Sequence, residues 1–289
     1  MRQSIRIIAI IAFIMFGFSA LFAEDTLEKI ERTGDFIVGV RDAAIPFAFI
    51  NNQNENVGFS VDMAKEFHRA LEARFGKSIR LTLKTTTPKT RIPLVANGTI
   101  DIECGSTTHT VDREDTVDFS ITVFLTGTQF LVKKSSGIRM AKDLAGKKIG
   151  AAQGSTNEKA ARDLNTQGFF KPQARIVVYQ EHSQGFLALQ QGIIDAYCTD
   201  GILLSGLQAK APNPDDFKLI GDLITYDPYA FIVRENDSNF RDFVNIQIID
   251  AIKSGKFMAL YEKWFGPAGV VPYPMTAEFA TLLKLQAWP

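Results

Sequence analysis

The sequence predicts an α/β fold in about two domains, each organised around mainly parallel strands with helices on their faces. Three observations lead to this prediction. Apolar runs of strand length alternate with amphipathic helical patterns, the order expected of a parallel sheet with crossover helices. One helix, turn and strand pattern occurs twice, once in each half of the chain. The length also fits about two domains of ~150 residues.

The first 23 residues have the composition of a secretory signal peptide. Arg2 and Arg6 precede an apolar run from Ile7 to Phe18, and small residues follow up to Ala23. The run is shorter than the ~20 residues that a membrane-spanning helix needs, so we expect cleavage near Ala23. No cysteine follows the run, so a lipid anchor is not expected. The rest of the chain is expected to be exported as a soluble protein.

Composition argues against nucleic-acid binding and against a scaffold held by disulfides. The chain has 32 basic residues, and removing Arg2 and Arg6 leaves 30 against 32 acidic ones. This near neutrality, without a basic stripe, argues against nucleic-acid binding. Hydrophobic residues make up 46% of the chain and can form a large core, whereas two cysteines, Cys104 and Cys198, are too few for a disulfide framework.

Helices and strands alternate along the N-terminal half. The run 36–40 predicts a buried strand, which ends at Arg41 and leads into a Pro46-Phe47 loop. Apolar residues at helical spacing over 61–75 predict an amphipathic crossover helix, and Gly98 is placed to cap a later one. The predicted elements are a helix over 26–31, a strand over 36–40, a helix over 61–75, a strand over 79–84 and a helix over 93–97.

A second α/β series follows in the C-terminal half. Residues 222–233 are expected to be extended, and Gly255 is expected to divide a helical pair over 239–264. The extended segments near 120–132 and 222–233 are candidates for strands that cross between lobes. The other predicted elements are a β-rich segment over 129–132, a turn over 143–146, strands over 148–152 and 175–179, and helices over 157–165 and 183–191.

The repeated pattern indicates a cleft between the two halves. Residues 94–106, LVANGTIDIECGS, align with residues 189–200, LQQGIIDAYCTD, with glycine, aspartate, cysteine and a final polar residue in register. Open parallel sheets bind ligands outside the carboxyl ends of their strands, so the final residues Ser106 and Asp200 are expected to face one another. The alternative is two ordinary β/α units that happen to align.

The stretch 100–120 carries a further binding signal. Its β-branched run breaks at Gly105 into hydroxyl residues that begin at Ser106. Arg113 follows, and its planar fork can hold a carboxylate through two parallel hydrogen bonds. The alternative is a polar loop with a solvated arginine.

Six further segments occur in an order and spacing that resemble one protein family. They are Gly58 to Lys65, Arg91 to Asp101, Arg113 to Ser120, Asp143 to Gly150, Gln153 to Thr156 and Tyr261 to Phe265. In these segments the chain resembles the solute-binding proteins of polar amino-acid ABC importers, over essentially its whole length after the leader. Residues 103–108, ECGSTT, look most like the glutamate/aspartate-binding branch.

The resemblance implies the type II periplasmic binding protein fold, with two lobes joined by a two-strand hinge. Lobe 1 would comprise residues 24–122 and 229–289, and lobe 2 residues 123–228. The hinge crossings would lie near 120–132 and 222–233.

The resemblance also implies how an amino acid is held. Arg113 would bind its α-carboxylate with Thr108 and with Thr156, beside Ser155. A helix start at Thr156 agrees, because free N–H groups there favour an anion. Asp200 would receive the α-ammonium with Ser106 beside it, although Asp200 as a helix N-cap is the alternative.

Three more positive groups match positions that surround the side-chain carboxylate in the acidic-amino-acid branch: Arg41, Arg91 and His182. A cleft with surplus guanidinium implies a ligand with surplus carboxylate, because an unpaired buried cation is costly. The alternatives are a surface salt bridge for Arg41, a helix N-terminal contact for Arg91 and a satisfied loop histidine for His182.

The sequence departs from the branch at Pro88, where a serine is often found. The missing hydroxyl contact would have to come from Thr87, which leaves the preference between glutamate and aspartate open. Phe47 is expected either as an apolar wall of the cleft or in the core. Cys104 and Cys198 are expected to be two buried thiols, because a bond between them would oppose opening of the lobes.

The expected function is therefore capture of an acidic L-amino acid, glutamate or aspartate, between two closing lobes, and its delivery to a membrane ABC permease. A periplasmic monomer is expected, without cofactor, metal or catalytic residues. Alternatives are a cyclohexadienyl dehydratase acting on prephenate or arogenate, a binding protein for neutral or other polar amino acids, and an extracytoplasmic sensor domain. No hydrolase, zinc-protease or phosphate-loop motif occurs in the sequence.

Overall fold

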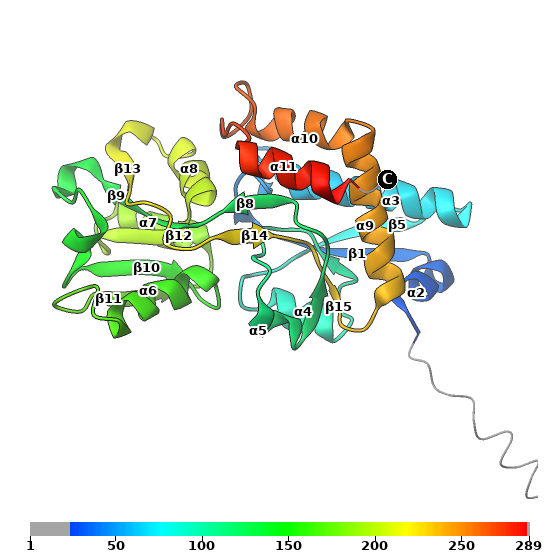
Figure 1. Ribbon diagram of the computed structural model, residues 1–289, viewed down its shortest axis with the longest axis horizontal. Coiled ribbons are helices and arrows are strands. Elements are labelled where there is room, and N and C mark those ends of the chain that lie inside the picture. The colour runs from blue at the N-terminus through cyan, green and yellow to red at the C-terminus, as the bar shows by residue number, and fades with distance from the viewer. Residues whose placement is uncertain (1–23, 288–289) are drawn as a thin grey trace, which may run out of the picture.

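The computed structural model describes residues 24–287 and has two lobes that lie side by side, joined by crossing strands (Figure 1). We call the lobe that holds the N-terminal strands lobe 1 and the other lobe 2. The predicted leader lies outside the described residues. Within the described part, no helix is both long enough and apolar enough to cross a membrane.

Lobe 1 contains a five-stranded sheet and a small three-stranded one. Their strands are β1 (Asp35–Val40), β5 (Arg80–Thr85), β6 (Ile102–Glu103), β7 (Val117–Phe119) and β15 (Ile232–Arg234), and β2 (Ala43–Ala44), β3 (Ala48–Ile50) and β4 (Asn56–Val57). The larger sheet has the order β5-β1-β6-β15-β7. β1 is parallel to β5 and β6, and β15 runs antiparallel between β6 and β7.

Lobe 2 contains a second five-stranded sheet with the same pairing pattern. Its strands are β9 (Thr128–Lys133), β10 (Lys148–Ala152), β11 (Arg175–Tyr179), β12 (Ala196–Asp200) and β13 (Phe217–Ile220), in the order β11-β10-β12-β9-β13. β10 is parallel to β11 and β12, and β9 is antiparallel to β12 and β13. The predicted fold class, two mainly parallel sheets flanked by helices, is confirmed.

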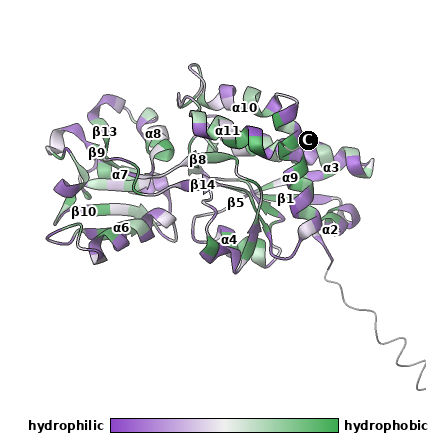
Figure 2. Cartoon of the chain, viewed as in Figure 1, coloured by the Kyte–Doolittle hydropathy of each residue, from purple (hydrophilic) through white to green (hydrophobic). Residues whose placement is uncertain are grey.

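Helices cover both sheets, and Figure 2 shows hydrophilic residues, in purple, along the helices as well as in the loops. Gly255, in the left-handed region at φ +79°, divides the C-terminal pair as predicted. Lobe 1 has α2 (Thr26–Thr33), α3 (Phe59–Phe75), α4 (Arg91–Ala96), α5 (Val111–Glu114), α9 (Ser238–Lys253), α10 (Lys256–Phe265) and α11 (Ala277–Gln286). Lobe 2 has α6 (Thr156–Thr166), α7 (His182–Gln190), α8 (Gly201–Ala209) and the short 3₁₀ turns Lys134–Ser136, Ala141–Leu144 and Pro214–Asp216.

Two short strands connect the lobes. β8 (Phe124–Thr126) and β14 (Asp227–Tyr229) pair antiparallel, with Thr126 opposite Asp227. Figure 1 shows both strands between the lobes. Residues 222–233 therefore do not form one strand, because β14 pairs with β8 in the hinge whereas β15 pairs within the lobe 1 sheet.

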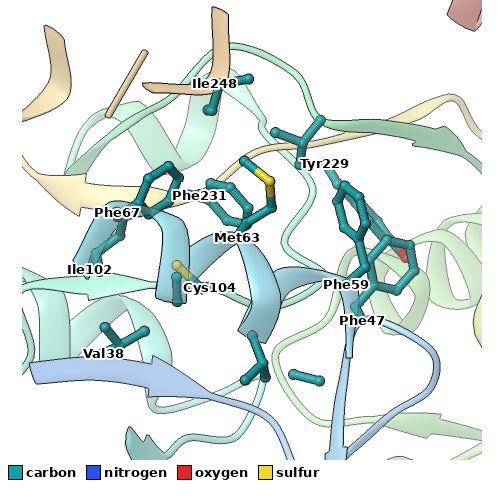
Figure 3. Close-up of a cluster of buried hydrophobic side chains, with 14 of the residues drawn as sticks. Val38, Phe47, Phe59, Met63, Phe67, Ile102, Cys104, Tyr229, Phe231 and Ile248 are labelled. Atoms are coloured by element: carbon teal, nitrogen blue, oxygen red, sulfur yellow. The ribbon is translucent and has the colours of Figure 1, made fainter. Parts of the chain in front are cut away.

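Each lobe has its own core. Figure 3 shows part of the lobe 1 core, in which Phe67 and Phe231 lie near Cys104 and Phe47 packs against Phe59 and Tyr229. Cys198 is buried in a separate cluster around the lobe 2 sheet. Both cysteines are free thiols, as predicted.

Three helices were not among the predicted elements. α5 is a short helix of four residues that carries Arg113. α8 follows β12 directly; its Leu204 and Leu207 pack in the lobe 2 core, whereas Leu203 packs against the lobe 1 core. α11 packs Phe279 and Leu283 against the lobe 1 core. β6 is also shorter than the apolar run that contains it, because the chain leaves the sheet after Glu103 and turns toward the other lobe.

Candidate ligand-binding site

Two buried arginines of lobe 1 line a cavity between the lobes. Arg41 directly follows β1, and Arg91 is the first residue of α4. Arg91 Nη1 donates to the carbonyl oxygen of Ser106 at 3.3 Å. The Nε atoms of both arginines are buried and have no hydrogen-bond partner among the described residues. Buried donors without partners favour a ligand that can accept hydrogen bonds.

Arg91 remains a cation at neutral pH despite its burial. Burial lowers its pKa to about 9; repulsion from Arg113 and Arg41 also lowers it, whereas Glu103 opposes the shift. Because this value lies above neutral pH, the guanidinium is protonated at pH 7. The cavity wall therefore carries positive charge that a ligand carboxylate can neutralise.

The loop after β6 brings two predicted hydroxyl residues to the same cavity. Ser106 Oγ is buried and has no partner among the described residues. Thr108 forms an isolated bridge with Tyr229 of the hinge, and its Oγ1 lies 3.3 Å from Thr156 Oγ1 of lobe 2. The loop thus offers one free hydroxyl and touches the opposite lobe.

Arg113 lies in α5 at the edge of the cavity and contacts both lobes. Its Nη1 donates to the carbonyl of Thr108 at 2.5 Å, and its Nη2 to the carbonyl of Gly154 at 3.5 Å. Burial lowers the pKa of Arg113, and the carboxylates of Glu103 and Asp200 counteract that shift. Arg113 lines an adjoining hollow together with Thr156, so it is next to the cavity rather than in its wall.

The start of α6 supplies the lobe 2 side. Ser155 is the N-cap, and its Oγ accepts from the N–H of Glu158 at 3.0 Å. Ser155 and Thr156 both line the cavity. The first turn of a helix has N–H groups without intrahelical acceptors, so this end attracts an anion.

Asp200 lies at the end of β12, fully buried in the cavity wall. Asn157 Nδ2 donates to its Oδ1 at 2.8 Å, and the hydroxyl of Tyr229 donates to its other oxygen. Burial, followed by the nearby carboxylate of Asp227, raises the pKa of Asp200 to about 7. Although Asp200 precedes α8, its side chain makes no cap hydrogen bond, so the structure places the carboxylate in the cavity rather than on the helix.

His182 is also in the cavity wall, but its charge differs from the expectation of a possible cation. Its Nδ1 lies 3.0 Å from the hydroxyl of Tyr197. Burial, with repulsion from Arg41 and Arg91, holds the pKa of His182 well below its usual value. The imidazole is therefore neutral at pH 7 in this arrangement and can act as a hydrogen-bonding group.

Two predicted residues lie away from the cavity. Phe47 is fully buried in the lobe 1 core, where its ring contacts Phe59 and Tyr229 (Figure 3), so the expectation of a cleft wall is wrong and its core alternative holds. Thr87 instead pairs with Thr90, its Oγ1 accepting from the Thr90 N–H at 3.1 Å ahead of α4. Pro88, the departure from the family pattern, does line the cavity.

The structure adds three polar residues that sequence reasoning missed. Glu181 of lobe 2 pairs with Arg41 of lobe 1, Nη2 to Oε2 at 2.7 Å. Asn157 and Tyr229 hold the carboxylate of Asp200. Only Glu181 had a signal in the sequence, since it is adjacent to His182, a predicted site residue. Tyr229 and Asn157 look like ordinary strand and helix residues in the sequence.

Together these residues form one polar cavity between the lobes. Larger hollows exist on the outer surface, including one among α2, α3 and α9. Among the five hollows described, only this cavity is lined by residues whose buried side-chain nitrogen or oxygen atoms lack hydrogen-bond partners. The cavity is narrow, so a ligand of amino-acid size enters only if the lobes or side chains move apart. Its walls are made by Arg41, Pro88, Arg91, Ser106, Thr108, Ser155, Thr156, Asn157, His182, Asp200 and Leu203.

The chain belongs to the bacterial extracellular solute-binding proteins, family 3, whose model matches residues 36–267. It is 35% identical to an L-glutamate/L-aspartate-binding protein of Pseudomonas aeruginosa over 265 residues, 89% of this chain and 87% of the relative. It is 34% identical to a glutamate/aspartate import solute-binding protein of Escherichia coli over 244 residues, 84% of this chain and 80% of the relative.

A solved structure has the same fold. The crystal structure of an ancestral amino acid-binding protein, described as a precursor of cyclohexadienyl dehydratase, superposes with a TM-score of 0.71 at 28% identity. The match covers 83% of this chain and 99% of the other.

Proposed function

We propose that this protein captures an acidic L-amino acid, glutamate or aspartate, between its lobes in the periplasm and delivers it as a monomer to a membrane ABC permease. The observation that carries the proposal is the charge of the cavity. Arg41 and Arg91 are buried in its wall with unpaired Nε atoms, and Arg113 lies at its edge. The names of the two relatives agree with this ligand class.

Each end of an amino acid has a matching group. Arg113, with Thr108 and the start of α6, is suited to the α-carboxylate, because a guanidinium fork and helix N–H groups both donate to anions. Asp200 is suited to the α-ammonium through a charge-assisted hydrogen bond. These two roles would serve any amino acid.

Arg41 and Arg91 are then left for the ligand's side chain. A neutral side chain would leave their buried charges without full compensation, whereas a second carboxylate would neutralise them. His182 and Ser106 can add hydrogen bonds to the same carboxylate or to the ammonium. An acidic amino acid therefore matches the cavity better than a neutral one.

The lobes provide complementary parts of the proposed site. Ligand that bridges them would favour the closed arrangement only through the additional contacts it makes there. The paired hinge strands β8 and β14 are short, which suits rotation of one lobe against the other.

Binding calorimetry with L-glutamate, L-aspartate and L-glutamine tests the proposal. We expect tighter binding of an acidic amino acid than of glutamine. Equal or tighter binding of glutamine would overturn the acidic ligand. Incubation with prephenate or arogenate provides the test for catalysis, and product formation would overturn a purely binding role.

A further inference from the structure

An ion pair joins the lobes at the cavity. Arg41 Nη2 donates to Glu181 Oε2 at 2.7 Å, from the end of β1 in lobe 1 to the residue just before α7 in lobe 2. The contact uses one nitrogen and one oxygen. Arg41 Nε and Glu181 Oε1 remain without hydrogen-bond partners among the described residues. Arg41 is therefore only partly satisfied by the protein.

The surroundings make this pair electrostatically strong. The Arg41 side chain is 1% exposed and that of Glu181 is 17% exposed. Charges removed from water interact far more strongly than surface charges, and removing one partner leaves the other uncompensated. Glu181 therefore offsets a large part of the positive field that Arg41 contributes to the cavity.

The position of Glu181 also relates it to the proposed ligand. Its neighbour His182 lines the cavity, as do Arg41 and Arg91, the groups assigned to the ligand's side-chain carboxylate. A second carboxylate bound to Arg41 would lie near the carboxylate of Glu181 and be repelled by it. A neutral amide in the same place would not be repelled.

We propose that Glu181 is a specificity-determining residue. It pairs with Arg41 while the ligand is bound to the same guanidinium, and it thereby reduces the preference of the site for acidic over neutral amino acids. This inference rests on the proposed function. Glu181 also ties the lobes together, which affects every ligand that binds between them. An effect on lobe closure changes the affinities for glutamate and for glutamine alike. It therefore cancels in the ratio of the two affinities, and a change in that ratio reports specificity alone.

The test compares the wild type with Glu181→Gln, which keeps the shape of the side chain and removes its charge. Calorimetry gives the dissociation constants of L-glutamate and L-glutamine for each protein. We expect the ratio of the glutamine to the glutamate constant to rise at least about tenfold in the variant, which corresponds to ~1.4 kcal/mol. Glu181→Ala should raise it as well, and serves if the first variant folds poorly.

Two controls separate this effect from a general loss of charge. Glu66→Gln removes a carboxylate that pairs with Lys256 on the outside of lobe 1, and should leave the ratio unchanged. In an Arg41→Met background, Glu181→Gln should raise the ratio less than in the wild type, because the Arg41 charge that it releases is gone and only the direct repulsion of the ligand carboxylate is relieved. A double-mutant cycle reports this coupling.

Different results would overturn the role of Glu181 and the proposed acidic ligand. Binding of both ligands with an unchanged or reduced ratio in Glu181→Gln would overturn the inference alone. A wild type that prefers glutamine would overturn the acidic ligand, yet the variant should still shift toward glutamate. A wild type that binds neither amino acid would overturn both.

Discussion

The hydroxyl of Tyr229, in hinge strand β14, donates a hydrogen bond to the carboxyl of Asp200 at the end of β12 in lobe 2. The residue proposed to receive the ligand's ammonium is thus bonded directly to the segment about which the lobes would rotate. Asp227, two residues earlier in the same strand, is buried nearby. The protonation state of the Asp200 carboxyl group should therefore affect both ligand binding and the contact with the hinge.

Ligand affinity should fall as the pH falls below about 7. Burial and then Asp227 raise the pKa of Asp200 to about 7, and the ligand's ammonium needs the charged carboxylate. Below that pH a proton must leave before the ligand binds, so affinity should drop by up to about tenfold per pH unit. Calorimetry between pH 5.5 and pH 8.5 measures this, and a flat profile would contradict it.

Tyr229→Phe should move the midpoint of that profile to higher pH. The tyrosine hydroxyl stabilises the charged carboxylate, so its removal raises the pKa of Asp200 further. Tyr226→Phe is a matched control, since Tyr226 is 87% exposed. An unchanged midpoint in Tyr229→Phe would show that another group controls the profile.

Asp200→Asn should abolish tight binding yet stabilise the ligand-free protein at alkaline pH. The folded pKa of about 7 lies above the ~3.9 of an unfolded aspartate, so this group lowers the unfolding free energy as pH rises from about 4 to about 7. The variant has no carboxyl group at this position, so its unfolding free energy should not show this decrease. Urea unfolding at pH 4.5 and pH 8 should show the larger gain at pH 8; a gain independent of pH would contradict this account.

Arg113→Ala should abolish binding of every amino acid, because the α-carboxylate is common to all. The partly buried hydrogen bond from Nη1 to the carbonyl of Thr108 would be lost as well. Arg113→Lys keeps the charge but not the two-pronged geometry, and should restore only part of the affinity. Competition binding with several amino acids measures both variants, and selective loss of glutamate alone would assign Arg113 to the side chain instead.

A disulfide between Thr108→Cys and Thr156→Cys should lock the lobes together. The two hydroxyl oxygens lie 3.3 Å apart across the gap, so the two side chains touch there. Neighbouring side chains in direct contact are candidates for a disulfide, which needs Cβ atoms ~3.5–4.5 Å apart. The oxidised variant should exchange ligand slowly and recover on reduction, because Cys104 and Cys198 are buried and should not interfere. Rapid exchange in the oxidised protein would argue against closure of these lobes over the ligand.

Phe47→Ala should lower the unfolding free energy by about 3 to 5 kcal/mol, as for other large core aromatics. Its ring packs against Phe59, Phe124, Tyr229 and Phe265. Affinity of the folded fraction should change little, since Phe47 is absent from the cavity wall. Calorimetry on folded protein, with chemical unfolding beside it, separates the two effects.

Local patterns were sufficient for most strands and helices, because parallel strands and amphipathic helices each bury a regular set of apolar residues. They also placed Ser106 just beyond one strand and Asp200 at the end of another, since strand polarity alone determines where such ends meet. They could not place Phe47, because an apolar residue after a proline fits a cleft wall and a core equally well.

Contacts between residues of opposite lobes could not be predicted from the sequence. Glu181 pairs with a residue 140 positions away in the chain, and only the relative placement of the lobes brings them together. The neutral state of His182 depends on burial and on two arginines from the other lobe, which no local pattern encodes. The observed cavity therefore differs from the expected one in the pairing of Arg41 and in the charge of His182, both of which depend on contacts between residues far apart in the sequence.

The position of β15 determines the order in which the chain can fold during synthesis. β15 lies between β6 and β7 in the lobe 1 sheet but begins only at Ile232, whereas β1 begins at Asp35. The nascent chain therefore holds two strands with exposed edges until its last quarter emerges, while the sheet of lobe 2 is already complete in sequence. Unpaired edges of this kind promote aggregation, so we expect β6 and β7 to need protection until β15 has been made.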